Sequence, residues 1–191
     1  MVHHQRHEHA GSCSRSILDA EKVFRAIGLK KGDTFLDVGS SSGYFSLVAS
    51  GIVGSHGKVY AVDIDEASID TLKEEISARG VKNLEAIVAD ITGKTSLAGE
   101  SIDVCLLANV LHGLFANNEM DGAFKEITRV LKTGATLGVV DFKKNANTPR
   151  PPVSIRLTPD EVTAIVAPYH YRKNQAVEVG TYHYAVVFSK E

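Results

Sequence analysis

Apolar residues recur along this chain at two spacings, one typical of buried strands and one typical of amphipathic helices. Short, mostly apolar runs predict buried parallel strands at residues 34–38, 58–62, 84–88, 102–108 and 136–142. Apolar residues three or four positions apart predict helices at residues 17–27, 45–52, 69–79 and 124–131. This alternation predicts an α/β fold, a three-layer Rossmann-like sandwich whose mostly parallel sheet lies between two layers of helices.

The alternation ends after residue 142. A proline-rich loop follows at residues 145–154, and Thr158-Pro159-Asp160-Glu161 then has the form of a helix N-terminus. Pro168 is expected to stop that helix. Two last runs, residues 176–179 and 182–188 joined at Gly180-Thr181, predict a C-terminal antiparallel hairpin that closes the sheet.

The length of 191 residues fits one domain. We expect residues 1–14, which are rich in histidine and have no apolar period, to form a mobile tail, and residues 15–191 to form a single domain. The histidines of the tail offer nitrogen ligands to a transition metal, but a solvated tail is the favoured interpretation, so we predict no metal site. These histidines are His3, His4, His7 and His9.

The composition of the chain limits the classes of partner that we expect. Apolar residues make up 43% of the chain and charged residues 23%, as in a soluble globular protein, and the net charge of -2 argues against a nucleic-acid partner. Cys13 and Cys105 form no CxxC pair, which favours a reducing, cytoplasmic setting. No stretch approaches the roughly 20 apolar residues of a membrane span, so no membrane partner is predicted.

The segment from Asp37 to Gly43 carries the strongest chemical signal. A glycine at the end of a strand brings backbone close to a ligand, and ligands of open α/β sheets bind at that edge. A pyrophosphate is disfavoured, because the spacing is Gly39-x-x-x-Gly43, the loop has no lysine, and the carboxylate of Asp37 suits a ligand with an ammonium and a sulfonium instead. Asp63, at the end of the second strand, is suited to accept both hydroxyls of a ribose.

With these residues the chain resembles the class I methyltransferases, in particular the small-molecule branch that includes the ubiquinone/menaquinone-biosynthesis and arsenite methyltransferases. The resemblance spans roughly residues 20–142. It includes an acid-and-glycine motif after the first predicted strand, in which Ser41 replaces the middle glycine. Further motifs lie at the ends of the second, third and fourth predicted strands, and a helix-and-turn motif extends from Glu126 to Gly134. The resemblance implies S-adenosylmethionine as cofactor, bound by Asp37, Gly39, Ser40, Ser41, Gly43, Asp63, Ile64, Asp90, Ile91 and Asn109.

Each motif alone also fits ordinary structure. The two glycines are compatible with a common strand-to-helix turn, and Asp63 and Asp90 with helix N-caps. The joint pattern favours the ligand site, because each acid falls at the carboxyl end of a predicted strand.

Methyl transfer from an activated sulfonium needs mainly alignment, so an obvious catalytic dyad is not required. His112, after the fourth strand, is our candidate for substrate contact or base, with an ordinary loop histidine as the alternative. Tyr44 is a second candidate, for which packing is favoured. His170 and His183 would line a pocket from the hairpin, although sheet packing is again favoured.

The sequence also narrows the acceptor. Asn109 to His112 lacks the N/D-P-P-Y/F pattern of the methylases of exocyclic base amines, and two cysteines cannot supply the set seen in arsenite methylation. The metal-binding acids of catechol-type methylation, expected near Asn109 and Asp141, form an incomplete set. We therefore predict methyl transfer to a small-molecule acceptor. The alternatives are a tRNA or protein methyltransferase, with Lys143, Lys144 and Arg150 as a basic rim, and a non-catalytic cofactor-binding module.

No insertion is long enough to form a separate substrate lid. The acceptor side is therefore expected to be covered by the N-terminal segment, by the proline-rich loop, or by a partner subunit in a homodimer.

Overall fold

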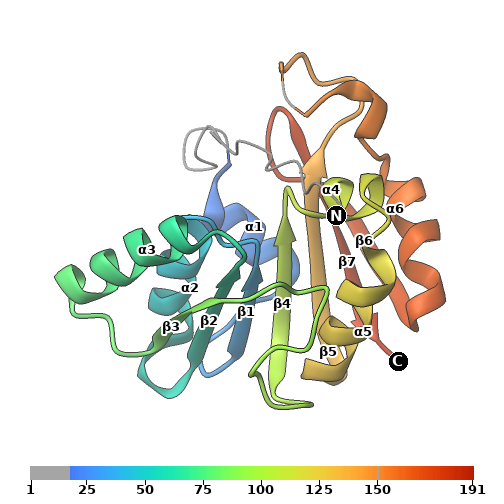
Figure 1. The fold of residues 1–191 in the computed structure, drawn as a ribbon. Coiled ribbons are helices and arrows are strands. Elements are labelled where there is room, and N and C mark those ends of the chain that lie inside the picture. Colours follow the sequence, from blue (N-terminus) through green and yellow to red (C-terminus); the bar gives the residue numbers. More distant parts are fainter. Residues whose placement is uncertain (1–17, 150) are drawn as a thin grey trace, which may run out of the picture.

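The computed structural model describes residues 18–149 and 151–191, which form a seven-stranded sheet between two layers of helices (Figure 1). The strand order is β3-β2-β1-β4-β5-β7-β6. β1 to β5 run parallel, and β7 pairs antiparallel with β5 and β6, so the predicted sheet with its closing hairpin is confirmed. The strands are β1 Thr34–Val38, β2 Lys58–Asp63, β3 Leu84–Val88, β4 Ile102–Ala108, β5 Leu131–Phe142, β6 Tyr171–Glu178 and β7 His183–Lys190.

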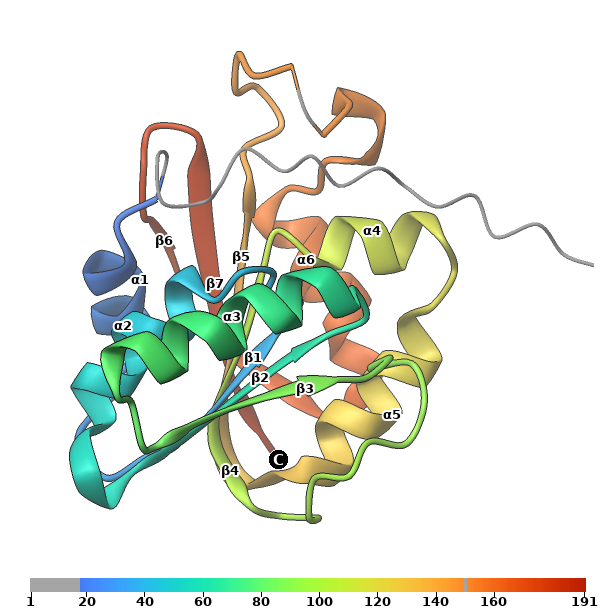
Figure 2. The ribbon, with the colours of Figure 1, turned by 60° about the vertical axis from the view of Figure 1, so that its left-hand side comes forward.

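Three helices cover each face of the sheet (Figure 2). One layer holds α1 (Ala20–Ile27), α2 (Tyr44–Val53) and α3 (Glu66–Arg79), and the other holds α4 (Leu111–Ala116), α5 (Met120–Val130) and α6 (Pro159–Val166). Short 3-10 turns lie at η2 (Gly54–His56), η3 (Val153–Ile155) and η4 (Ala167–Tyr169).

The core follows the alternation of side chains along each strand. Leu36 of β1 packs toward α5, while the neighbouring Phe35 packs toward α1 and α2, where Phe24 meets it edge-on with ring centroids 5.5 Å apart. Both side chains are fully buried. Because each central strand is apolar on both faces, the sheet is held between two cores rather than against one.

Three elements depart from the sequence prediction. β6 begins at Tyr171 rather than at residue 176, because residues 172–175 are polar and become part of a strand only by pairing with β7. β5 begins at Leu131 rather than at residue 136, because Leu131 already pairs with Ile102 of β4. The six-residue helix α4 has no apolar period long enough to predict it. The mobile tail predicted for residues 1–14, with its histidines, lies outside the described residues.

The parallel strands all end at one edge of the sheet, where β7 starts. We call this the carboxyl edge. It brings together the glycine loop after β1, the acids after β2 and β3, the β4–α4 junction, the end of β5 and His183. His170 precedes β6 at the opposite edge, where its carbonyl accepts the Glu191 N–H, so it lies away from the carboxyl edge, and the favoured packing interpretation fits its position.

Candidate active site

The two loop glycines are required by both backbone and space. Gly39 has φ +69°, and a Cβ there would lie 2.5 Å from Cγ2 of Val110. Gly43 has φ +83°, and its Cβ would lie 2.2 Å from Cδ1 of Leu72 on α3. Any side chain at either position would be strained and would clash with a neighbour. The loop therefore keeps its backbone open at the carboxyl edge.

Ser41 and Asp63 link the glycine loop to the second strand. The Ser41 N–H donates to Oδ2 of Asp63 at 2.7 Å, and the Asp65 N–H donates to Oδ1 at 2.9 Å. Each carboxylate oxygen keeps further acceptor capacity, so Asp63 is oriented by the protein and still able to accept ligand hydroxyls. Ile64, next to it, is 66% exposed, so an apolar side chain lies open to a ligand beside the acid.

Asp37 lies beneath the loop rather than on its surface. It is 2% exposed and accepts the Ser46 hydroxyl of α2 at 2.6 Å. Burial, reinforced by the nearby charge of Asp63, raises the pKa of Asp37 to about 7, against the lowering effect of the Ser46 hydrogen bond. Its influence on a ligand at the loop is therefore electrostatic, because the carboxyl group has almost no open surface.

The third-strand residues combine a turn with an open carboxylate oxygen. Oδ1 of Asp90 accepts both the backbone N–H and the hydroxyl of Thr92, at 2.8 and 2.7 Å. Asp90 is exposed, while the side chain of Ile91 is buried in the core on the α5 side. The turn interpretation and the ligand interpretation of Asp90 are thus compatible, since they use different oxygens.

Two side-chain oxygens at the carboxyl edge, Oγ of Ser40 and Oδ1 of Asn109, are buried and have no hydrogen-bond partner among the described residues. They occupy matched positions, because Val38 of β1 lies opposite Leu107 of β4, and Ser40 and Asn109 each lie two residues after a member of that pair. Asn109 is held with φ +62° by its N–H bond to the Val140 carbonyl. Unpaired buried polar atoms cost about 1–3 kcal/mol each, so this pair fits a polar ligand bridging the two strand ends, as the methionine part of the predicted cofactor would.

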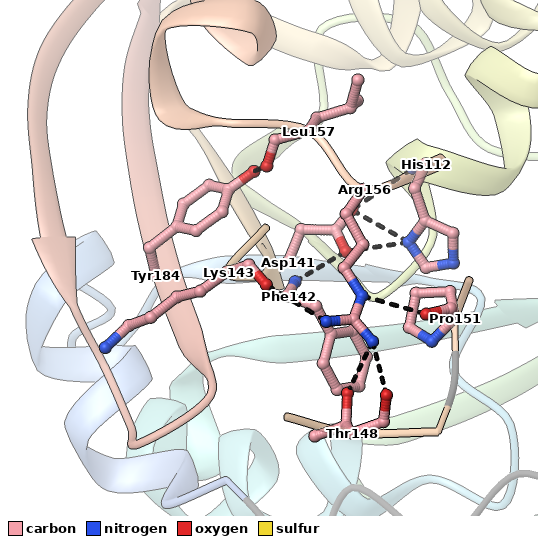
Figure 3. A network of polar contacts seen from close by, with 9 residues as sticks. All are labelled: His112, Asp141, Phe142, Lys143, Thr148, Pro151, Arg156, Leu157 and Tyr184. Atoms are coloured by element: carbon pink, nitrogen blue, oxygen red, sulfur yellow. Dashed lines mark hydrogen bonds and ion pairs between the residues drawn. The ribbon is translucent and has the colours of Figure 1, made fainter. Parts of the chain in front are cut away.

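His112 and Asp141 form a hydrogen-bonded pair across the β4–β5 ends (Figure 3). Nδ1 of His112 lies 2.8 Å from Oδ1 and 3.0 Å from Oδ2 of Asp141, and the His112 N–H donates to Oδ2 at 3.2 Å. Asp141 is completely buried, whereas the His112 side chain is 13% exposed. The carboxylate fixes the ring by its Nδ1 and leaves Nε2 directed away from it (Figure 3).

Next to this pair, residues 143–149 and 151–157 surround the buried side chain of Arg156, and we call these residues the proline loop. Arg156 is 1% exposed and donates to the carbonyls of Pro151, Ala146 and Thr148, among others, and to the Thr148 hydroxyl (Figure 3). Tyr184 of β7 supports the end of the loop by donating its hydroxyl to the Leu157 carbonyl at 2.7 Å. The loop also packs on α4 through η3, so it is a built structure next to the histidine.

The remaining candidates have clearer structural roles. Tyr44 donates its hydroxyl to the Leu18 carbonyl at 2.8 Å and tethers the segment before α1, as the packing alternative predicted. Glu126 and Arg129 of the helix-and-turn motif bind each other, and that pairing holds the pKa of Glu126 low, at about 2.

Sequence reasoning missed Asp141 as the partner of His112 and missed Arg156 altogether. The acid at the end of an apolar strand was a usable signal for Asp141, because it lies at the same edge as the other acids. Within the described ranges, no group of three or more His, Cys, Asp or Glu residues is arranged to hold a metal ion. No helix in those ranges has the length and apolar character to cross a membrane.

Comparison with known proteins agrees with this geometry. The family described as methyltransferase domain matches residues 29–177. The chain is 30% identical to an arsenite methyltransferase of Halobacterium salinarum over 76% of this chain and 35% of that protein. It is also 30% identical to a ubiquinone/menaquinone biosynthesis C-methyltransferase of Azotobacter vinelandii over 63% of this chain and 46% of that protein. The chain thus spans less than half of the length of these curated relatives.

Among solved structures, a SAM dependent methyltransferase from Aquifex aeolicus superimposes with a TM-score of 0.85 and 31% identity, covering 95% of this chain and 94% of the other. The family match, this superposition and the arrangement of the carboxyl edge lead to one conclusion: the chain belongs to the S-adenosylmethionine-dependent methyltransferase domain family.

Proposed function

We propose that this chain transfers a methyl group from S-adenosylmethionine to a small-molecule acceptor, and that His112 removes a proton from the reacting group of that acceptor. The proposal rests on the hydrogen bond between His112 and Asp141, in which Nδ1 lies 2.8 Å from Oδ1. This pair lies at the same edge of the sheet as the glycine loop. A histidine oriented by a buried carboxylate is a common arrangement for a general base.

The cofactor would lie along the carboxyl edge. S-adenosylmethionine, when bound, supplies a methyl group that its positive sulfur already activates. The unpaired oxygens of Ser40 and Asn109 suit the methionine part, which carries an ammonium and a carboxylate. Gly39, Ser41 and Gly43 provide the open backbone beside them. Around the nucleoside, Asp63 would accept the ribose hydroxyls and the exposed Ile64 side chain would flank the adenine. Asp90 would accept the adenine amino group, and the backbone N–H of Ile91 would meet the ring.

His112 would act through Nε2. Because Asp141 accepts the proton on Nδ1, the neutral imidazole carries its lone pair on Nε2, which takes the proton of a hydroxyl, amine or thiol. The buried carboxylate then stabilises the imidazolium that forms. Such a base contributes about 10²- to 10⁴-fold to a rate. An acceptor whose reacting atom has no proton to lose would not need this base.

Three observations support a small acceptor. The proline loop is closed over the His112 side by the Arg156 contacts. The lysines of the suggested basic rim are already paired, Lys143 with Glu178 and Lys144 with Glu161, and Arg150 lies outside the described residues. The relatives named above are, by their names, methyltransferases of arsenite and of a quinone pathway. A cytoplasmic setting and a homodimer stay predictions from the sequence.

Calorimetry with S-adenosylhomocysteine tests the cofactor site. Asp63→Ala should weaken binding by about 10- to 100-fold, because hydrogen bonds to a charged group contribute about 1.5–3 kcal/mol. Asp70→Ala, which removes an exposed acid of α3, is the matched control and should bind as the wild type does. Unchanged affinity of the Asp63 variant would mean that the ribose lies elsewhere.

Transfer of radiolabelled methyl from S-adenosylmethionine to a metabolite extract tests the reaction. His112→Gln and Asp141→Asn should keep cofactor affinity and lose most of the transfer, whereas His56→Gln, at an exposed 3-10 turn near the opposite edge, should keep both. Cofactor binding without any transfer by the wild type would favour a binding module. Full transfer by His112→Gln would show that the acceptor needs no base from this residue.

A further inference from the structure

The imidazole of His183, the first residue of β7, is buried at the carboxyl edge and has no hydrogen-bond partner in the described part of the chain. The His183 side chain is 0% exposed, and neither ring nitrogen has a partner among the described residues. A neutral imidazole always presents one N–H donor and one acceptor nitrogen, so both capacities are unused here. Burying them unpaired is costly, and an apolar side chain would fill the same space without that cost. The histidine therefore points to a polar partner that is present only when the site is in use.

The position of His183 connects it with the proposed reaction. It is opposite Phe142 in the β5–β7 register, and the two rings pack with centroids 4.1 Å apart. The residue before Phe142 is Asp141, whose side chain turns to the other face of the sheet and holds His112. The end of β5 thus stands between two histidines, with His112 on the α4 side and His183 on the α1–α2 side.

The backbone around His183 is fixed by two hydrogen bonds. The Lys143 N–H donates to the Tyr182 carbonyl at 2.7 Å, and the Val179 N–H donates to the His183 carbonyl at 3.2 Å. These two bonds join the strand ends on both sides of His183, and the Phe142 ring packs against the imidazole. The strand end that carries the imidazole is therefore a fixed part of the edge, as a specificity-determining group requires.

We propose that His183 is an acceptor-binding residue that recognises a hydroxyl or carbonyl group on an uncharged acceptor, opposite the base His112. This rests on the proposed methyl transfer. Phe142, which is buried and packs against the imidazole, would form an apolar wall beside the body of such an acceptor.

The charge state of the ring agrees with this role. Burial lowers the pKa of His183 to about 4, with Lys143 acting in the same direction and Asp141 opposing. At neutral pH the ring is uncharged, so it donates one hydrogen bond and accepts another but neither attracts an anion nor competes with His112 as a base. A neutral acceptor group is the matching partner.

Nitrogen-15 NMR of the S-adenosylhomocysteine-loaded protein tests the proposal with two probes of equal size, phenol and toluene. Because the ring is enclosed, the probes must be small enough to enter when the surrounding segments open transiently. Phenol should shift the His183 ring resonances, identified by their loss in His183→Phe, and should bind at least about fivefold more tightly than toluene. His183→Phe should bind both probes equally.

The controls separate this proposal from the methyl-transfer proposal. The variant His112→Gln should keep the preference for phenol. Both His112→Gln and His183→Phe should keep the affinity of the wild type for S-adenosylhomocysteine. His183→Asn, which retains a donor and an acceptor, should keep part of the preference and guards against misfolding of the phenylalanine variant. Unmoved His183 resonances, or equal binding of phenol and toluene by the wild type, would overturn the assignment even if transfer to other acceptors is observed.

Discussion

Ser41 stands where the methyltransferase pattern has its middle glycine, and it keeps the conformation of a glycine, with φ +48°. A left-handed backbone costs a serine about 1 kcal/mol. The loop retains it because this conformation lets the Ser41 N–H reach Asp63 at 2.7 Å. The substitution at this position therefore preserves the geometry of the loop and adds strain.

Ser41→Gly should raise the free energy of unfolding, by up to about 1 kcal/mol, because it removes the left-handed strain at the cost of some unfolded-state entropy. Glu100→Gly is the matched control, since Glu100 has φ +50° on an exposed turn away from the carboxyl edge. Urea denaturation should give similar gains for both. A clear loss of stability in Ser41→Gly alone would mean that the serine side chain supports the loop.

At the scale of elements, the proline loop is organised by one buried cation. Arg156 is the largest fully buried side chain, and its guanidinium also lies over the ring of Phe142, 5.9 Å from the centroid. The fork of five N–H donors suits a ring of carbonyl groups in a way that a lysine does not. The proline loop has no regular pattern in the sequence. In the structure its described residues are held together by Arg156, and the loop packs against α4.

Arg156→Met should lower the free energy of unfolding by about 2 kcal/mol or more, because several loop carbonyls lose their buried partner. Hydrogen exchange at residues 144–149 should speed up at the same time. Lys144→Gln, which breaks only an exposed ion pair of the same loop, should leave both measurements nearly unchanged. Unaltered exchange in Arg156→Met would show that the loop is held by other contacts.

At the scale of the whole molecule, Asp37 links stability to pH. Its pKa is about 7 in the folded protein against 3.8 as the ordinary value, mainly because of burial. Between these two values the folded state keeps a proton that the unfolded state has lost, so the contribution of Asp37 to stability falls as pH rises from about 4 to about 7. His183, with its lowered pKa of about 4, acts in the opposite direction, because acid favours protonation of the unfolded chain.

The substitution Asp37→Asn removes the titrating carboxyl group and so isolates the contribution of Asp37 to the pH dependence of stability. The stability of the variant relative to the wild type should rise by up to about 1.4 kcal/mol per pH unit between pH 4 and 7 and then level off. Denaturant titrations at several pH values measure it, with Ser46 left intact so that its hydroxyl still has an acceptor.

Ligand binding should report the same carboxyl group. S-adenosylmethionine should bind the wild type more tightly as pH rises from 6 to 8, because the ionised carboxylate favours a cationic ligand, and Asp37→Asn should remove this dependence. A pH profile that is identical in wild type and variant would show that Asp37 does not ionise in this range.

The sequence by itself determined the five parallel strands, the glycine loop and the order of the acids along the carboxyl edge. These features are local: strand periodicity, the need for glycine at Gly39 and Gly43, and the position of an acid such as Asp63 at a strand end are properties of short segments. The family of the chain could be predicted for the same reason.

Only the tertiary structure decided the pairing of His112 with Asp141, which are 29 residues apart. The same holds for the hydrogen bonds of Arg156 to the proline loop, the first half of β6 and the helix α4. The tertiary structure also places His183 at the carboxyl edge and His170 at the opposite edge of the sheet. Each of these depends on which distant strand or loop supplies the neighbouring surface. A hydrogen bond or a buried charge across that surface has no periodic signature in the sequence, since its partner is selected by packing of the whole sheet.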